Sequence, residues 1–172
     1  WTCAMSRGLL SGAAHPERVV LIDYSLPSTA SRLWVIDAST GAVLRSTRVA
    51  HGQGSGEDLA TTFSDVDQSH MSSLGVFRTA ETYVGKHGTS VRLDGLEPGW
   101  NGRARDRAIV MHGASYVSDA FVEEHGRIGR SWGCPAVGED VIDALVDEVS
   151  GGALLVAWYP DAAWRRDSSF LH

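Results

Sequence analysis

Cys134 and His112 are the two residues in this sequence whose types could carry covalent chemistry. Cys134 ends the segment S-W-G-C at residues 131–134, and His112 follows an apolar run further upstream. The thiolate is the reactive form, but a free thiol with a pKa of about 8.5 is mostly protonated at neutral pH. A neighbouring imidazole can take that proton, so the pair is typical of a cysteine nucleophile activated by a histidine base.

The turn around Cys134 is built from small residues, which leaves backbone N–H groups free to point at a developing negative charge. We therefore expect this turn to supply an oxyanion hole as well as the nucleophile. Ser131 is expected either to hydrogen-bond within the turn or to contact the substrate.

Two histidines compete for the role of base. His125 is nearer to Cys134 in sequence, but it follows two glutamates and precedes a glycine, which is typical of an exposed turn. His112 ends the apolar run at residues 108–111, which predicts a buried strand. Because the end of a strand holds a side chain in a fixed position, we assign the role of base to His112 and keep His125 as the alternative.

A zinc site and a disulfide are the other arrangements open to these residues. His112, His125 and Cys134 with one water would suit a catalytic zinc, but the sequence has no tight CxxC or HxxxH pair. A bond between Cys3 and Cys134 would consume the thiol, although two distant cysteines do not make a disulfide framework. We therefore expect a free Cys134 thiol, no metal and no cofactor.

The length, charge and composition of the chain limit the classes of protein to which it can belong. A chain of 172 residues is expected to form one domain with a proper core. Its net charge of -6 argues against a nucleic-acid binder, and no apolar run approaches the roughly 18 residues of a membrane span. The chain begins at Trp1, so we expect its start to have been removed. A basic cluster at residues 103–107 is expected to face water, or else to meet a carboxylate-bearing substrate.

Short apolar runs separated by turn residues predict a mainly β domain. The first three runs are so closely spaced that they favour an antiparallel meander. The expected strands are residues 19–24, 33–37, 43–49, 72–79, 82–88, 90–93, 108–111 and 153–159.

One helix is predicted after Cys134, at residues 139–149, because its apolar side chains fall on one face. Residues 119–124 predict a short helical turn in an insert that could cover the site as a lid. Residues 160–172 show no clear pattern. We expect an N-terminal extension at residues 1–17, a domain at residues 18–159 and a C-terminal tail at residues 160–172.

Several loop and hairpin residues are candidates for lining the site. Tyr83, His87 and Ser90 flank a predicted glycine turn, and they are expected to be pocket residues or ordinary strand positions. His51 opens a glycine-rich segment that lacks the Lys-Ser/Thr ending of a phosphate-binding loop. It is expected to belong to a wide turn or to line the site.

The ordered set of motifs resembles the L,D-transpeptidase catalytic domain, with its YkuD-like fold, and is most similar to the murein L,D-transpeptidase branch (YkuD_2). A Ser-x-Gly-Cys segment alone is a weak signal, whereas the set spans residues 18–159. The motifs are I-D-Y-S-L-P-S at 22–28, V-A-H-G-Q-G-S-G at 49–56, S-S-L-G-V-F at 72–77, G-K-H-G at 85–88, L-D-G-L-E-P-G at 93–99 and G-R-S-W-G-C-P-A-V at 129–137.

The resemblance implies a β-sandwich or barrel-like domain with one short helix after the cysteine. It implies that Cys134 attacks a stem-peptide carbonyl next to diaminopimelate and forms a thioester, with His112 as the base. The carbonyl of Gly113 would orient the imidazole, and the N–H groups of Trp132, Gly133 and Cys134 would form the oxyanion hole. An amine of a second stem peptide would then accept the acyl group.

The resemblance also implies a setting for this chemistry. The protein would act on peptidoglycan in the periplasm or outside the cell, as a monomer without a cofactor, and carbapenems would acylate Cys134.

Two departures from the family pattern leave alternatives open. Many members have Arg or Asn at the position of Ala136, and that function would fall to Arg130 or to the 103–107 cluster. The insert between His112 and Cys134 is also longer than in common members. The donor bond could therefore be the one that releases D-Ala or one nearer L-Ala. The acceptor could be water, as in an L,D-carboxypeptidase or endopeptidase, and a non-catalytic wall-binding module is the last alternative.

Overall fold

The structure is a computed structural model that describes residues 17–172. The predicted extension up to residue 16, which includes Cys3, lies outside the described residues. Eight strands form a single sheet in the order β3-β2-β1-β8-β4-β5-β6-β7. They are β1 Arg18–Asp23, β2 Leu33–Asp37, β3 Val43–Thr47, β4 Gly75–Gly85, β5 Gly88–Gly95, β6 Val110–Gly113, β7 Ala136–Val137 and β8 Leu154–Trp158. The prediction of a mainly β domain is confirmed.

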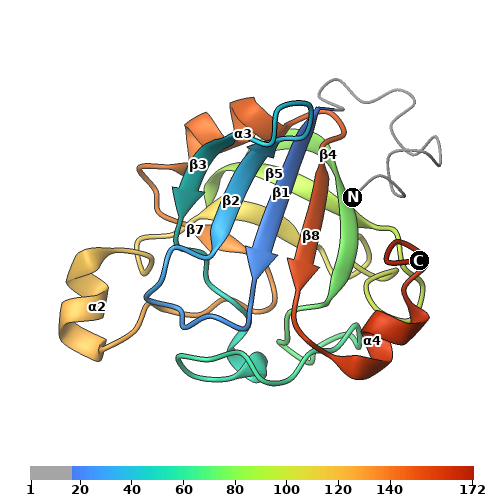
Figure 1. Cartoon of the computed structure of the whole chain (residues 1–172). Coiled ribbons are helices and arrows are strands. Elements are labelled where there is room, and N and C mark those ends of the chain that lie inside the picture. The colour runs from blue at the N-terminus through green and yellow to red at the C-terminus, as the bar shows by residue number, and fades with distance from the viewer. Residues whose placement is uncertain (1–16) are drawn as a thin grey trace.

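The sheet curls into a nearly closed barrel (Figure 1). Its two edges meet where Ala50, which follows β3, forms an antiparallel bridge with Ala136 of β7. The antiparallel meander of β1, β2 and β3 is confirmed, and β8 pairs in parallel with β1 and antiparallel with β4. Alternating side chains of these strands, such as Val20 and Ile22 of β1, fill the interior.

Two details of the strands differ from the prediction. Residues 72–79 and 82–88 do not form two strands, because β4 runs through both segments with a bulge between Thr79 and Thr82. β7 was missed, since two residues show no periodicity.

Three helices and a 3-10 turn accompany the barrel: α2 Asp119–His125, α3 Ile142–Val149, α4 Ala162–Asp167 and η1 Gln53–Ser55. The helix after Cys134 is confirmed as α3, but it begins at Ile142 because residues 139–141 form a turn instead. α4 contradicts the expectation that residues 160–172 have no pattern. Its start is capped by Asp161, whose carboxylate accepts from Trp164 N at 2.8 Å. Within residues 17–172 no helix has the length and hydropathy needed to cross a membrane.

Trp164 joins α4 to the core, and its replacement by alanine should destabilise the fold. Its ring is fully buried against Trp158, with centroids 5.4 Å apart, and its Nε1 donates to Glu97 Oε2 at 3.3 Å. We expect Trp164→Ala to lower the free energy of unfolding by about 3–5 kcal/mol, through the cavity it leaves. Urea denaturation measures this, and Trp164→Phe, which keeps an aromatic ring, should cost less. Equal stability of Trp164→Ala and the parent would contradict the packing role.

Candidate active site

His112 lies in a row of paired residues across four strands. It pairs with Ser90 of β5 and with Ala136 of β7, and Ser90 in turn pairs with Tyr83 of β4. Paired residues share one face of a sheet, so this row faces away from the neighbours Val91 and Met111 in the main core. His112 is therefore buried near the end of β6, as the apolar run at residues 108–111 predicts.

The hydrogen bond of the His112 ring defines its tautomer. Nδ1 lies 2.8 Å from the carbonyl oxygen of Gly113. A carbonyl can only accept, so Nδ1 carries the proton and Nε2 keeps a free lone pair. Burial lowers the pKa of His112, which keeps the imidazole neutral. This is the protonation state that a general base needs.

The turn that carries Cys134 is held together by Ser131. Its Oγ donates to the carbonyl of Cys134 at 2.6 Å and accepts from the N–H of Gly133 at 3.1 Å. Gly133 has φ +120°, and a Cβ there would lie 2.7 Å from the carbonyl oxygen of Met71. The turn therefore requires glycine at this position. Of the two expectations for Ser131, hydrogen bonding within the turn is the one that its contacts show.

Cys134 is a free thiol with two backbone neighbours. The N–H of Val110 donates to Sγ at 3.5 Å, and Sγ lies 3.8 Å from the carbonyl oxygen of Ala108. Burial raises the pKa of the Cys134 thiol, while the Val110 hydrogen bond and the charges of Arg107 and Lys86 oppose that rise. The Cys134 thiol and the His112 imidazole are thus both uncharged at neutral pH.

The thiol and the imidazole are not directly hydrogen-bonded to each other within residues 17–172. Such contacts are often long in a free enzyme and tighten when substrate binds. The N–H groups of Trp132 and Cys134 likewise have no acceptor in that part of the chain, whereas the N–H of Gly133 is engaged by Ser131. Two of the three donors expected from the sequence are therefore free to meet a substrate oxygen.

Trp132 forms an exposed aromatic surface beside Cys134 in the chain. Its side chain is 70% exposed, and its ring stacks on His70 with centroids 4.6 Å apart and an interplanar angle of 11°. The Nε2 of Gln53 lies 3.0 Å from His70 Nδ1, which fixes the histidine under the indole. Trp132 therefore does not pack under the turn, and one face of its ring is open next to Cys134.

Of the three hairpin candidates, His87 makes the contact with the His112 ring. Its ring stacks on His112 with centroids 4.5 Å apart. The hydroxyl of Ser90 donates a hydrogen bond to the carbonyl of Gly88 at 3.2 Å. The guanidinium of Arg92 lies over the ring of Tyr83, 4.9 Å from its centroid. Ser90 and Tyr83 share the row of His112, but the Ser90 hydroxyl and the Tyr83 ring contact other residues of the hairpin.

Arg130 and the 103–107 cluster were expected to replace the Arg or Asn that many family members have at the position of Ala136. Arg130, Arg105 and Arg107 form contacts with other residues instead. Arg130 binds Glu57 Oε1 at 2.8 Å, and Arg105 binds both Glu81 and Asp94. Arg107 is buried and donates to the carbonyl of Met71 at 2.8 Å. Ala136 itself packs into a small apolar cluster with Ala50, Ala114, Val117 and Ile128.

His51, expected to belong to a wide turn or to line the site, is fully buried next to the turn that carries Cys134. Its Nδ1 lies 2.7 Å from Arg32 Nη2, and its carbonyl accepts from Ser131 N at 3.0 Å. Because the arginine can only donate, His51 must be neutral with Nδ1 as the acceptor. Burial, and then the charge of Arg32, lower its pKa to about 4.

This buried histidine should make the fold sensitive to acid. Between pH 6.5 and about 4 the unfolded chain binds a proton at His51 that the folded chain excludes, so the stability falls as pH falls. We expect a loss of about 2 kcal/mol from this residue between pH 7.5 and pH 5. Urea denaturation at both pH values measures it. His51→Gln should flatten the dependence and the exposed His125→Gln should leave it unchanged; an unchanged slope in His51→Gln would contradict the assignment.

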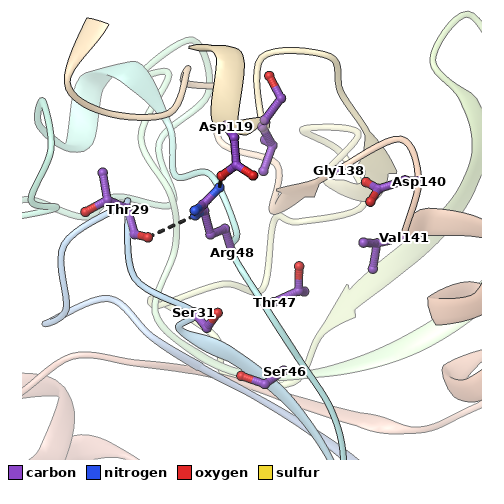
Figure 2. A pocket seen from close by; sticks show the side chains of 11 residues that line it. Thr29, Ser31, Ser46, Thr47, Arg48, Asp119, Gly138, Asp140 and Val141 are labelled. Carbon is purple, nitrogen blue, oxygen red and sulfur yellow. Dashed lines mark hydrogen bonds and ion pairs between the residues drawn. The ribbon is translucent and has the colours of Figure 1, made fainter. Parts of the chain in front are cut away.

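His125 ends α2, which projects from the barrel (Figure 1), rather than lying in a turn. Its ring contacts Phe121 at a centroid distance of 4.1 Å and lies 4.0 Å from Glu124. The start of α2 is tied to the chain after β3, because Asp119 binds Arg48 at 2.6 Å (Figure 2). In residues 17–172 no three His, Cys, Asp or Glu side chains gather to hold a metal ion.

Tyr116 is a neighbour of the site that sequence reasoning missed. Its side chain packs on Gly129, where a Cβ would lie 2.5 Å from Tyr116 Cβ, and its carbonyl accepts from Gly129 N at 2.8 Å. Burial, and then the charge of a Cys134 thiolate, raise the pKa of Tyr116 to about 12. The sequence held no signal for this contact, because Tyr116 lies in an irregular loop.

Comparison with known proteins shows which family this chain belongs to. A family model described as L,D-transpeptidase catalytic domain (YkuD_2) matches residues 6–158. No curated protein was found to be similar in sequence. Among solved structures, an L,D-transpeptidase from Mycobacterium smegmatis is similar at 16% identity and a TM-score of 0.50, over 83% of this chain and 59% of that chain.

Two further solved structures show the same fold. L,D-transpeptidase 3 from Mycobacterium tuberculosis, in complex with a faropenem-derived adduct, has 11% identity and a TM-score of 0.53, over 84% of this chain and 61% of that chain. An L,D-transpeptidase from Stackebrandtia nassauensis has 13% identity and a TM-score of 0.50, over 92% and 64%. The present chain spans less than two thirds of the length of each. Through the match over residues 6–158, the chain belongs to the family of L,D-transpeptidase catalytic domains.

Proposed function

We propose that this domain cross-links peptidoglycan stem peptides through a thioester on Cys134. The observation that carries the proposal is the His112 ring, whose Nδ1–H is bound to the Gly113 carbonyl so that Nε2 is left as a base. The free N–H groups of Trp132 and Cys134 support an oxyanion hole at the same turn.

The proposed reaction has two acyl transfers. His112 Nε2 takes the Cys134 proton as Sγ attacks the carbonyl carbon of the donor amide bond, which for release of D-Ala is the carbonyl of diaminopimelate itself. The C–N bond then breaks, and the leaving amine receives the proton from His112, which leaves a thioester. In the second transfer His112 takes a proton from the attacking amine of another stem, the amide forms, and the thiol leaves with that proton.

Water can replace the amine in the second transfer, which would make the domain an L,D-carboxypeptidase or endopeptidase. A non-catalytic wall-binding module would show an unreactive Cys134. The mostly buried thiol favours neither alternative by itself, so products must decide.

Pure disaccharides with tetrapeptide or pentapeptide stems test the proposal. We expect cross-linked dimers by liquid chromatography and mass spectrometry, and fragmentation identifies the donor bond as the one that releases D-Ala or one nearer L-Ala. Shortened monomers alone would establish the hydrolase, and unchanged substrates without a thioester would leave the binding module.

β-Lactams provide a second probe of the thiol. L,D-transpeptidase 3 from Mycobacterium tuberculosis carries a faropenem-derived adduct, which makes this class of compound a rational choice. We propose that a carbapenem acylates Cys134, seen as one added mass on the intact protein and lost in Cys134→Ser. The proposed substrate implies action outside the cytoplasm, in the periplasm or at the wall, and we propose that the domain acts as a monomer.

A further inference from the structure

Ser72 connects the segment before β4 to the turn that carries Cys134. The residue is only 1% exposed, and its hydroxyl donates to the carbonyl oxygen of Gly133 at 3.3 Å. The same oxygen accepts from the N–H of Gly52 at 3.0 Å, and the backbone N–H of Ser72 donates to Ser55 Oγ at 2.9 Å. Ser72 is thus held in place by the segment after β3, while its hydroxyl holds the turn.

The direction of the Ser72 proton follows from the groups around it. The Tyr24 side chain is hydrogen-bonded to the Ser72 side chain, and burial raises the pKa of Tyr24, so its phenol stays protonated. A backbone N–H can only donate and a carbonyl can only accept. The one proton of the Ser72 hydroxyl therefore points at Gly133, and its lone pairs meet Gly52 and Tyr24.

Two glycines allow this close approach. A Cβ at Gly133 would lie 2.7 Å from the carbonyl oxygen of Met71, and a Cβ at Gly52 would lie 2.9 Å from Ser72 N. Both distances are too short for any residue with a side chain. Glycine at these two positions therefore lets Met71 and Ser72 pack directly against the turn.

The hydrogen bond from Ser72 fixes the direction of the Cys134 N–H. The peptide between Gly133 and Cys134 is trans and planar, so its C=O and its N–H point in opposite directions. Because the carbonyl is directed at the buried Ser72, the N–H points away from it. That N–H has no acceptor in the part of the chain from residue 17 onward, so it is a free donor with a fixed direction.

We propose that Ser72 is a positioning residue for the oxyanion hole: it fixes the Gly133–Cys134 peptide so that the Cys134 N–H meets the oxygen that becomes negative during acyl transfer. This proposal rests on the proposed function and adds a residue outside the turn to its site. When the N–H donates to an oxyanion, the peptide polarises and its carbonyl becomes a better acceptor, so the Ser72 hydrogen bond strengthens. Ser72 therefore stabilises the transition state more than the free site.

Thr79 of β4 provides the matched control. It is also 1% exposed, and its Oγ1 donates to the carbonyl of Val149 at 2.6 Å and accepts from Gly152 N at 3.1 Å. This pattern of bonds matches that of Ser72, but neither partner belongs to the turn around Cys134. Ser72→Ala and Thr79→Val should each lower the melting temperature by about 2–4 °C, so both variants stay folded.

Two reagents separate the oxyanion hole from the reactivity of the thiol, in protein that carries Cys3→Ser. Faropenem, which forms an adduct with L,D-transpeptidase 3 from Mycobacterium tuberculosis, is attacked at its lactam carbonyl, and that attack creates an oxyanion. Iodoacetamide alkylates the same sulfur by displacement of iodide, and no oxyanion forms. The rates of both reactions are followed by mass spectrometry of the intact protein.

We expect Ser72→Ala to slow acylation by faropenem by about tenfold and to leave alkylation by iodoacetamide unchanged. The loss is smaller than the roughly 10²–10³-fold loss for a deleted oxyanion donor, because the Cys134 N–H is still present. Thr79→Val should change neither rate. Parent-like acylation in Ser72→Ala would overturn the proposal, and so would equal slowing of both reactions.

The position of the peptide is measured separately by NMR, without turnover. Gly133–Cys134 is the only Gly-Cys pair in the sequence, so ¹³C-carbonyl glycine and ¹⁵N-cysteine together give one correlation, from this peptide. Ser72→Ala should shift that signal and Thr79→Val should leave it in place; an unshifted signal in Ser72→Ala would overturn the proposal. The proposed function fails in a different way, if iodoacetamide alkylates the parent protein but neither faropenem nor a tetrapeptide stem acylates it.

Discussion

Replacing Cys134 by serine should abolish thioester formation and lower turnover by about 10⁴-fold or more, the size of loss seen when a catalytic nucleophile is removed. Serine is close in size and keeps a hydroxyl near the N–H of Val110, so the turn should persist. Intact-protein mass spectrometry with a tetrapeptide stem detects the thioester, and the same digest gives turnover.

Cys3→Ser is the matched control for this experiment, because it removes the other cysteine of the chain. It should leave thioester formation at the level of the parent protein. Retained turnover in Cys134→Ser, with an unchanged melting temperature, would refute the nucleophile. A gain of thioester formation in Cys3→Ser would instead indicate that the two cysteines pair in the parent protein.

His112→Ala should be nearly as damaging as loss of the thiol, with turnover lowered by about 10⁴-fold. The reason lies in the hydrogen bond from His112 Nδ1 to the Gly113 carbonyl at 2.8 Å, which leaves Nε2 as the acceptor of the thiol proton. A single-turnover assay of thioester formation measures the effect directly.

The rival base supplies the control. His125→Ala should form the thioester at the parent rate, since the ring contacts Phe121 and Glu124 on α2. The double variant Cys134→Ser with His112→Ala should be no worse than either single variant, because the two groups act as a unit. Loss of the thioester in His125→Ala, together with its survival in His112→Ala, would reverse the assignment.

Local apolar pattern was enough to predict most strands, because apolar side chains such as Ile109, Val110 and Met111 are buried in the core. It was also enough to place His112 near a strand end. β7 could not be predicted in this way, since its two residues are a strand only because β6 lies beside them. The end of the chain is similar: α4 depends on the cap at Asp161 and on the buried contact between Trp164 and Glu97.

The site residues show the same contrast between local pattern and long-range contact. The motif around Cys134 predicted the candidate nucleophile, but the residues that surround each candidate come from segments distant in the sequence. His51 lies under the turn because Arg32, from another loop, donates to it. Tyr116 lies in the irregular loop after β6, so no spacing in the sequence marks its contact with Gly129.

The segment after β3 joins the two ends of the sheet and also holds the turn that carries Cys134. Ala50 bridges Ala136, the carbonyl of His51 accepts from Ser131 N, and Gln53 N donates to the Ser131 carbonyl at 2.8 Å. Separation of the barrel edges would therefore release the turn around Cys134 in the same event, before the rest of the core is exposed. The turn around Cys134 thus keeps its shape only while the two edges of the barrel stay joined. Loss of activity on heating or in denaturant would therefore report the first opening of the barrel rather than the unfolding of its whole core.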